Sequence, residues 1–241
     1  MNELIANVEK TVYPIIQKAL LQKRYELLET EAKEFIEAFG IKTPGHIATS
    51  SRGEAIQAAK SIGYPVVLKI VSPDISHKTD VGGVKLGIKD DYGVADAYDE
   101  IIGNVKERQP GARIQGILVQ KMSPPSTEVI VGGLRDPQFG PTVMFGLGGI
   151  FVEVFKDVSF RIAPVSEYEV FDMIHDIKGA KILKGFRNRE AVDIPALAQT
   201  IMQVSDIMVN IEEVGEIDLN PVLVYPEGLK TVDARIVLRQ I

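Results

Sequence analysis

The chain has 241 residues, 45% of them hydrophobic and 25% charged, so it is long enough to bury the core of one large globular domain or of two small ones. Its net charge of −6, without a cluster of Lys and Arg, argues against a nucleic-acid partner, and the lack of cysteine excludes disulfides and thiolate metal sites. Because the N-terminus MNELIANVEK lacks the apolar core of a signal peptide and no apolar run approaches transmembrane length, we expect a cytoplasmic protein without a membrane partner.

The first half of the chain predicts alternating helices and strands. Apolar residues recur at helical spacing from residue 3 to 23, in a segment that reads as an arm before the main body. Further helices are predicted for residues 28–39, 51–62 and 91–107, and strands for residues 66–70, 84–88 and 114–122. We expect this half to form a β-α-β-β-α-β unit that ends in the strand over residues 114–122.

The second half begins after Ser123-Pro124-Pro125-Ser126, the clearest break in the sequence. Ser166 and Glu169 form a capping box that opens a helix, and residues 194–211 predict the longest helix of the chain. Strands are predicted for residues 128–133, 142–147, 160–165, 216–225 and 230–238.

These elements predict an α+β fold with two subdomains that face each other across a cleft. We expect a helical arm over residues 1–24, a first subdomain over residues 25–122 and a second over residues 123–241.

A lysine and a glycine pair give the first half a candidate phosphate site. Lys69 lies in the apolar strand VVLKI, where a lysine is rarely buried without a partner. It either points to solvent from an edge strand or reaches a bound phosphate. The pair Gly82-Gly83 makes either a plain hairpin turn or a mobile loop whose N–H groups cover phosphates.

His77 lies between these two features, in the polar stretch Ser76 to Asp80 that follows the turn Ser72-Pro73-Asp74. Such a histidine is either a solvated loop residue or a phosphoryl carrier. A neutral imidazole can attack phosphorus with one nitrogen while a carboxylate orients the other.

Near the C-terminus, oxygen ligands gather on the last predicted strands. Asp218 and Asn220 alternate on one strand, so they face the same side, and Asp233 lies on the next predicted strand. Carboxylate and amide oxygens suit Mg²⁺, which keeps waters and shares phosphate oxygens. The alternative is a solvated sheet face.

Two common nucleotide-binding motifs are absent. The sequence has no G-x-x-x-x-G-K-[ST] loop, and Gly146-Leu147-Gly148-Gly149 does not complete G-x-G-x-x-G. A bound nucleotide would need another architecture.

Three stretches, in order and spacing, resemble the ATP-grasp family, and within it the β subunit of ADP-forming (NDP-forming) acetyl-CoA synthetases. They are PVVLKIVSPDISHKTDVGGVKLGI, EVIVGGLRDPQFGPTVMFGLGGIFVEVFKDVSFRIAPV and EIDLNPVLV. The resemblance covers nearly the whole chain. It implies an ATP-grasp fold, with the nucleotide in the cleft between two α+β subdomains.

The resemblance also implies roles for individual residues. His77 corresponds to a histidine that relays phosphoryl groups in this branch, and Asp218 to the glutamate of Glu-x-Asn-Pro, at a position suited to hold a phosphohistidine. Asn220 and Asp233 correspond to the magnesium ligands. The implied nucleotide-binding positions fall into four groups. They are the strand lysine and the turn after it (Lys69, Ser72), the phosphate-covering loop (Gly82, Gly83, Val84), the adenine hinge (Val119, Gln120, Lys121, Met122) and a ribose-side acid (Glu128).

The activity so implied converts acyl-CoA, ADP and phosphate into carboxylate, CoA and ATP, with ATP/ADP and Mg²⁺ as cofactors. It requires a separate CoA-binding α subunit, in an α2β2 hetero-oligomer, which would carry the acyl-CoA chemistry and a first phosphohistidine. Two alternatives are a self-sufficient carboxylate–amine ligase and a non-catalytic nucleotide-sensing subunit. The missing substrate domain argues against the first, and the retained candidate catalytic residues argue against the second.

Overall fold

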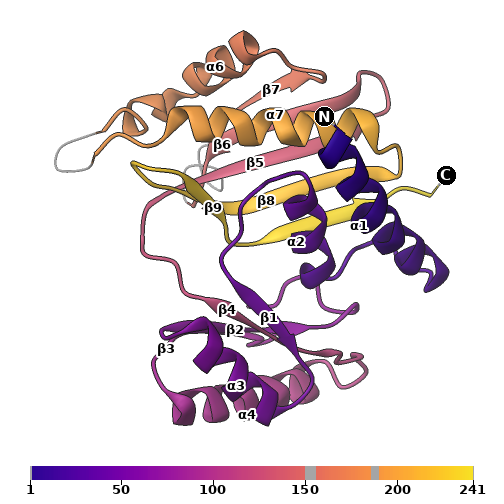
Figure 1. Ribbon diagram of the computed structural model, residues 1–241, viewed down its shortest axis with the longest axis vertical. Coiled ribbons are helices and arrows are strands. Elements are labelled where there is room, and N and C mark those ends of the chain that lie inside the picture. Colours follow the sequence, from indigo (N-terminus) through magenta and orange to yellow (C-terminus); the bar gives the residue numbers. More distant parts are fainter. Residues whose placement is uncertain (1, 150–155, 186–189, 241) are drawn as a thin grey trace. The chain divides into compact units, whose positions relative to one another are not determined.

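The structure is a computed structural model that describes residues 2–149, 156–185 and 190–240. By packing, the chain divides into two compact units (Figure 1). Unit 1 combines Met1–Thr43 with Pro125–Ile241, and unit 2 is Pro44–Pro124. None of the helices in the described part of the chain has the length and apolar character that a membrane span requires.

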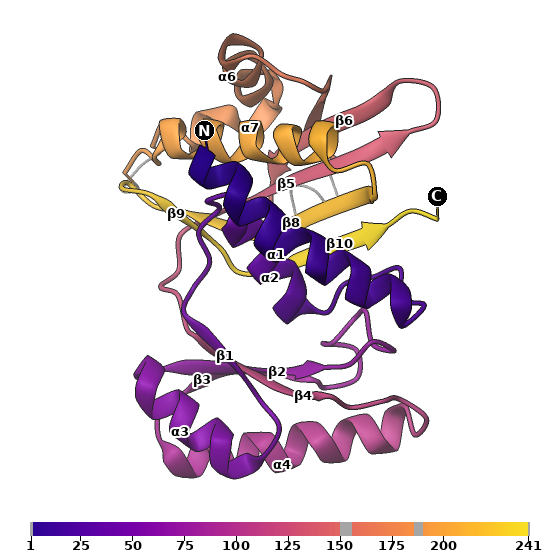
Figure 2. The same ribbon diagram turned by 45° about the vertical axis from the view of Figure 1, so that its right-hand side comes forward.

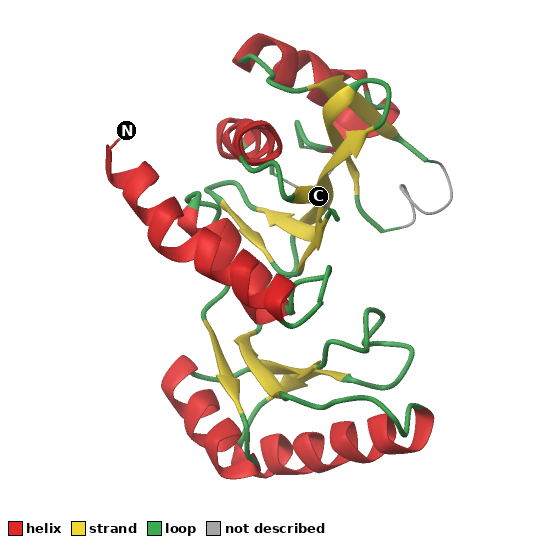
Figure 3. Ribbon diagram, turned by 90° about the vertical axis from the view of Figure 1, so that its right-hand side faces the viewer, coloured by secondary structure: helices red, strands yellow, loops and turns green. Residues whose placement is uncertain are grey.

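Unit 2 is a four-stranded antiparallel sheet with two helices on one face. The strand order is β1–β4–β2–β3, and the helices α3 and α4 lie side by side against the sheet (Figure 3). The bounds are β1 His46–Thr49, α3 Arg52–Ile62, β2 Val66–Val71, β3 Val84–Ile88, α4 Asp91–Arg108 and β4 Gly116–Lys121. The inner strands are therefore β2 and β4.

Alternation along the inner strands decides which residues of unit 2 face its helices. Alternate apolar residues of these strands are buried in one core with α3 and α4: Val66, Leu68, Ile70, Ile117 and Val119. The intervening positions lie on the opposite face of the sheet, and they include Lys69 and Gln120. Both helices begin at capped N-termini, because Ser51 accepts the Glu54 N–H and Asp90 accepts the Gly93 N–H.

Unit 1 is a larger antiparallel sheet with its helices on one face (Figures 1 and 2). The strand order is β10–β8–β5–β6–β7, and β9 pairs with β8. The strands are β5 Thr127–Asp136, β6 Gly140–Leu147, β7 Val158–Ile162, β8 Val214–Val224, β9 Leu229–Thr231 and β10 Ala234–Leu238. The helical segments are α1 Asn2–Leu21, α2 Glu29–Ala38, α6 Glu167–Asp176, the short 3₁₀ helix η1 Lys178–Ile182, and α7 Ile194–Asn210.

One face of this sheet packs on the helices, and the other carries the candidate site. Val131, Val143 and Phe145 belong to the same buried core as Leu197 and Ile201 of α7. The residues between them must point the other way. On that open face, five residues of neighbouring strands are paired with one another in a row across the sheet: Arg235, Asp218, Gly132, Met144 and Phe160.

The N-terminal segment differs from the expected arm. Val12 and Ile16 are buried in the core of unit 1, so α1 is part of that unit. Residues that follow it pair with β10: the Leu27 N–H donates to the Ile236 carbonyl over 3.0 Å, and the bridge Glu26–Val237 lies beside it. The packing units thus place residues 25–43 with the second half of the chain, whereas the expected first subdomain began at residue 25.

Two further expectations are wrong in detail. The strand expected over residues 230–238 is two strands, β9 and β10, and Asp233 lies in the connection between them. The helix over 194–211 is not the longest, because α7 has 17 residues whereas α1 has 20 and α4 has 18.

Candidate functional site

Lys69 lies on an inner strand of unit 2. On β2 its Cα pairs with Leu118 of β4 on one side and with Val84 of β3 on the other, and the residue is only 4% exposed. The alternative of an edge-strand lysine in solvent is therefore wrong. The same register brings Val84, the first residue after the glycine pair, directly beside Lys69.

The glycine pair closes the loop through its own backbone. The Gly82 N–H donates to the Thr79 carbonyl over 3.0 Å, and the Gly83 N–H donates to the Lys78 carbonyl over 2.7 Å. A Cβ at Gly83 would lie 2.5 Å from Cγ2 of Ile70, so only glycine fits this close approach. Both N–H groups are satisfied inside the loop, so they would have to leave these carbonyls to cover a phosphate.

His77 lies in this loop and is exposed, whereas Ile75, two residues earlier, is buried. Ser72, at the start of the loop, accepts the Asp74 N–H on its hydroxyl over 3.2 Å. Ser72 therefore shapes the turn that leads to His77.

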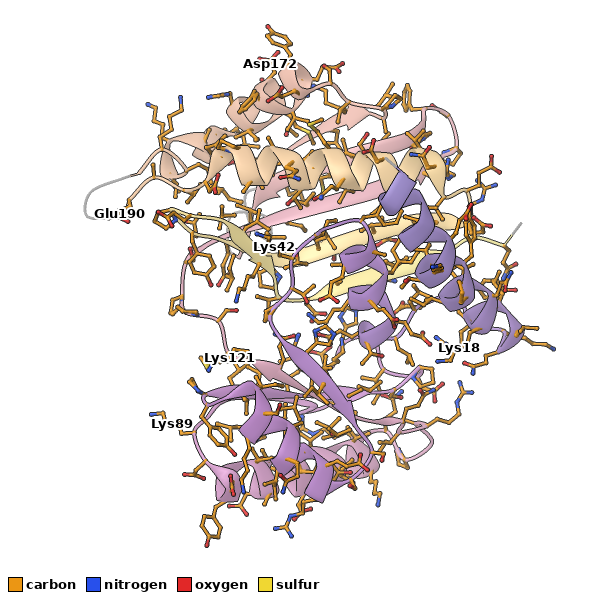
Figure 4. The ribbon with its side chains drawn as sticks, in the orientation of Figure 1. Lys18, Lys42, Lys89, Lys121, Asp172 and Glu190 are labelled. Atoms are coloured by element: carbon orange, nitrogen blue, oxygen red, sulfur yellow. The ribbon has the colours of Figure 1, made fainter. Side chains whose placement is uncertain are left out.

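The predicted adenine hinge, residues 119–122, is the end of β4 and the residue that follows it. Val119 is buried on the helix side. Gln120 is 1% exposed, and its amide oxygen has no hydrogen-bond partner among the described residues. The Nζ of Lys121 (labelled in Figure 4) donates to the carbonyls of residues 63 and 64 over 2.8 Å each. The Met122 N–H donates to the Pro65 carbonyl over 3.1 Å. Of these groups, the Gln120 amide oxygen is the acceptor left for a ligand.

The oxygen ligands of unit 1 lie on β8 and in the connection that leads into β10. Asp218 and Asn220 alternate on β8, and the Asn220 N–H reaches the Asp233 carbonyl over 3.3 Å. The structure thus brings together the three residues that the sequence singled out. Asp218 also lines a hollow of about 370 Å³ on the open face, together with Gly132, Met144 and other residues.

The Asp218 carboxyl is in an environment that disfavours its charge. Burial is the main cause that raises its pKa, the charges of Glu216 and Asp233 raise it further, and Arg235 opposes the shift. Arg235 lies opposite Asp218 on β10, but its guanidinium donates to Glu216 over 2.7 Å and to Glu26 over 3.1 Å. The Oδ1 atom of Asp218 is buried without a hydrogen-bond partner in the described part of the chain.

Glu128, the expected ribose-side acid, is exposed on β5 of unit 1. Its carbonyl accepts the Gly148 N–H over 2.8 Å, and a Cβ at Gly148 would lie 3.1 Å from the Glu128 Cβ. The glycine-rich stretch therefore passes directly beside Glu128. Residues 150–155, which continue that stretch, lie outside the described residues.

A family model described as an ATP-grasp domain matches residues 18–238 of the chain. Over 224 residues the chain is 46% identical to the "Acetate--CoA ligase [ADP-forming] I subunit beta" of Pyrococcus furiosus, covering 93% of this chain and 96% of that one. The chain belongs to the ATP-grasp family, among the β subunits of ADP-forming acetate–CoA ligases. The expected fold class and family are confirmed.

Solved structures agree with this assignment. The ATP-grasp chain is similar to acetyl-coenzyme A synthetase 1 of Ca. Korarchaeum cryptofilum in complex with coenzyme A, Ca-AMPCP and HgCl⁺, with a TM-score of 0.92 and 53% identity over 94% of this chain and 99% of that one. A second structure of that protein holds coenzyme A and Mg-AMPPCP, with a phosphohistidine segment pointing towards the nucleotide binding site. Its TM-score is 0.83, with 50% identity over 94% and 99% of the two chains.

Sequence reasoning missed the charged residues around the ATP-grasp Asp-x-Asn motif. Glu216 lies two positions before Asp218 on β8, so alternation along that strand could have identified it. Arg235 lies opposite Asp218 on β10, a cross-strand pairing that alternation within one strand does not show. Lys33 of α2 carried no such signal. It is fully buried, and its Nζ donates over 2.6 Å to the carbonyl of Val232, the residue before Asp233.

Proposed function

We propose that this ATP-grasp chain is the nucleotide-binding β subunit of an ADP-forming acyl-CoA synthetase, which interconverts acyl-CoA, ADP and phosphate with carboxylate, CoA and ATP. The observation that carries the proposal is 46% identity to a named β subunit over 96% of its length. The same observation favours this function over a carboxylate–amine ligase or a nucleotide sensor.

Asn220 and Asp233 would hold Mg²⁺ on unit 1. Both side chains offer oxygen atoms as metal ligands, and the Asn220 N–H donates to the Asp233 carbonyl, so the two residues are neighbours. The Oδ1 atom of Asp218, which has no hydrogen-bond partner among the described residues, lies on the same strand as Asn220. Among the described residues, no group of three or more His, Cys, Asp or Glu is arranged to hold a metal by itself. That fits Mg²⁺, which binds through one or two carboxylates, waters and substrate phosphates. Bound Mg²⁺ would neutralise the charge of the transferring phosphoryl group.

His77 would carry the phosphoryl group on this subunit. One imidazole nitrogen would use its lone pair to form a P–N bond as the bond between phosphorus and the donor breaks. A β-phosphate oxygen of ADP would then attack the phosphorus, and the P–N electron pair would return to the imidazole. The other ring nitrogen keeps its proton throughout, so the histidine is regenerated unchanged. Lys69 would stabilise the negative charge of the phosphates.

The partner would be a CoA-binding α subunit with its own phosphohistidine, in an α2β2 complex in the cytoplasm. Two observations support a partner of this kind. The Pyrococcus furiosus relative is itself a subunit beta, and the similar Ca. Korarchaeum cryptofilum structure contains coenzyme A and a phosphohistidine segment.

The test uses the chain co-purified with its co-expressed partner. We expect ATP formation that depends on an acyl-CoA, ADP and phosphate. With [γ-³²P]ATP and Mg²⁺, this chain should take up acid-labile, base-stable label that is lost in His77→Ala. His175→Ala is the matched control, because His175 is exposed at the end of α6 in unit 1.

Two outcomes would count against the proposal. Unchanged turnover in His77→Ala, with label on the partner alone, would refute the relay. A co-purified complex that forms no ATP with any acyl-CoA would refute the synthetase assignment.

A further inference from the structure

The loop that carries His77, residues 72–83, is fastened on both sides of the histidine. Ile75 is 6% exposed and belongs to the hydrophobic core of unit 2. Immediately after His77, the Lys78 carbonyl accepts the Gly83 N–H over 2.7 Å. The Gly83 carbonyl in turn accepts the Ile70 N–H over 2.8 Å, which ties this turn to β2. The freely exposed part between these points is Ser76-His77.

A carboxylate–guanidinium contact fastens the start of the loop to the segment between α4 and β4. The Asp74 carboxylate accepts the Arg113 backbone N–H over 2.8 Å, Nε over 3.0 Å and Nη2 over 2.7 Å. The Asp74 carbonyl also accepts Nε2 of Gln109 over 2.8 Å. We call the contact between Asp74 and Arg113 the Asp74–Arg113 clamp. The hydrogen bonds from Arg113 lower the pKa of the Asp74 carboxyl to about 2, so this carboxyl is charged at neutral pH.

Two side chains of α4 fasten the other end of the loop. Arg108 donates to the Asp80 carbonyl over 3.0 Å, and Asn104 donates to the Gly82 carbonyl over 3.3 Å. All these contacts lie within unit 2. The histidine is therefore exposed but has little length of free chain with which to move.

We propose that Asp74 and Arg113 are positioning residues, which hold the loop of His77 in one place on unit 2 so that the phosphoryl donor must come to it. The inference rests on the proposed phosphoryl relay. Phosphoryl transfer needs the nitrogen and the phosphorus about 3–3.5 Å apart and aligned, and a misplacement of about 1 Å costs about 100-fold in rate. An exposed ion pair adds little to global stability. The effect of the clamp should therefore appear in transfer rate and not in the unfolding midpoint.

The experiment measures the initial rate at which [γ-³²P]ATP and Mg²⁺ label His77 in the complex with the partner subunit. Arg113→Leu should lower that rate about 10- to 100-fold. It should leave the Kd for ADP within about twofold of the wild-type value, because Lys69 and the Gly83 turn do not touch the clamp. Arg113→Lys keeps the positive charge but cannot make the bidentate hydrogen bonds to the carboxylate. Its labelling rate should therefore lie between those of Arg113→Leu and the wild type.

The matched control is Arg52→Leu. Arg52 pairs with Asp99 over 3.3 Å on the helices of the same unit, and both side chains are more than half exposed. This variant should label His77 at the wild-type rate.

Three outcomes would overturn the inference. One is a wild-type labelling rate in Arg113→Leu. Another is a loss of ADP affinity in proportion to the loss of rate, which would indicate a structural role. The third is an unlabelled His77 in the wild-type complex, which would refute the relay itself. Because the wild type is measured first, this last failure is distinguishable from the other two.

Discussion

Replacing Asp218 with asparagine should stabilise unit 1 while it abolishes phosphoryl transfer. The carboxyl is held by the fold in surroundings that disfavour its charge, since burial raises its pKa and Glu216 raises it further. Arg235, which could neutralise it, donates to Glu216 and Glu26. Asp218→Asn keeps the shape of the side chain and removes the charge. We therefore expect its free energy of unfolding to exceed that of the wild type at neutral pH.

The expected gain follows from the unpartnered Oδ1 atom. A buried polar atom without a partner costs about 1–3 kcal/mol, and a neutral amide keeps part of that cost. A gain of about 1 kcal/mol, or about 2–4 °C in the unfolding midpoint, is the expected size for a chain of this length. The sign depends on pH, because a raised pKa means that the folded state binds the proton more tightly than the unfolded state. Protonation of Asp218 contributes its whole stabilisation of the folded state at pH values below the pKa that this carboxyl has in the unfolded chain. The contribution is lost as the pH rises through the pKa that it has in the folded chain. The advantage of Asp218→Asn should therefore shrink on acidification.

Urea unfolding at a series of pH values, for wild type and variants side by side, measures this difference. Asp136→Asn is the control with the opposite sign. The N–H groups of Phe139 and Gln138 lower the pKa of Asp136, so its charged form stabilises the fold above its unfolded pKa, and that contribution is lost as pH falls. Asp136→Asn should destabilise at neutral pH and have no effect in acid. The reasoning is wrong if both variants shift stability in the same direction, or if the advantage of Asp218→Asn grows as pH falls.

Three other substitutions test separate parts of the structure. The guanidinium of Arg135 donates to the Met208 carbonyl over 2.6 Å at the end of α7. Arg135→Met should therefore lower the free energy of unfolding in urea by about 1–3 kcal/mol. An unchanged unfolding midpoint would show that water replaces the guanidinium as the donor to this carbonyl. Gly83→Ala places a Cβ 2.5 Å from the Ile70 side chain, so the backbone must shift. This shift should lower the free energy of unfolding by about 1–3 kcal/mol. It should also slow the labelling of His77, which lies in the same loop. Gln120→Glu offers the adenine amino group a charged acceptor and repels the guanine carbonyl oxygen. The ratio of kcat/KM for ADP over GDP should then rise about tenfold, which corresponds to about 1.4 kcal/mol, and an unchanged ratio would place the base elsewhere.

Local pattern was enough to find the elements that bear the chemistry. The apolar run that Lys69 interrupts predicts a strand, and the structure has β2 there, buried along its whole length. Asp218 and Asn220 share a face because they are two apart on β8. The first conclusion depends on a short apolar run and the second on the two-residue period of a strand, and neighbouring residues in the sequence determine both.

Pairings between distant residues could not be read in the same way. Arg113 follows Asp74 by 39 residues, and no periodicity links a loop to the segment that follows a later helix. Leu27 bonds to Ile236 across most of the chain, which is why an apparent arm belongs to unit 1. The sequence predicts Asp233 on a strand over residues 230–238, whereas it lies in the connection between β9 and β10. At the break between β9 and β10, the Val232 carbonyl accepts a hydrogen bond from Lys33, 199 residues away in the sequence, and no local pattern shows this contact.

The groups proposed to handle the phosphoryl on this chain all lie on elements that hold them in place. Lys69 is on an inner strand, Asp218 is on a strand paired on both sides, and the His77 loop is fastened at both ends. In the proposed relay, a carrier that travels would therefore belong to the partner subunit. If the acyl group stays on the partner, as the proposed function requires, substitutions that loosen the Asp74–Arg113 clamp should slow transfer by the same factor for every acyl-CoA. A factor that varied with the acyl group would mean that the clamp acts on the partner's chemistry and not on His77.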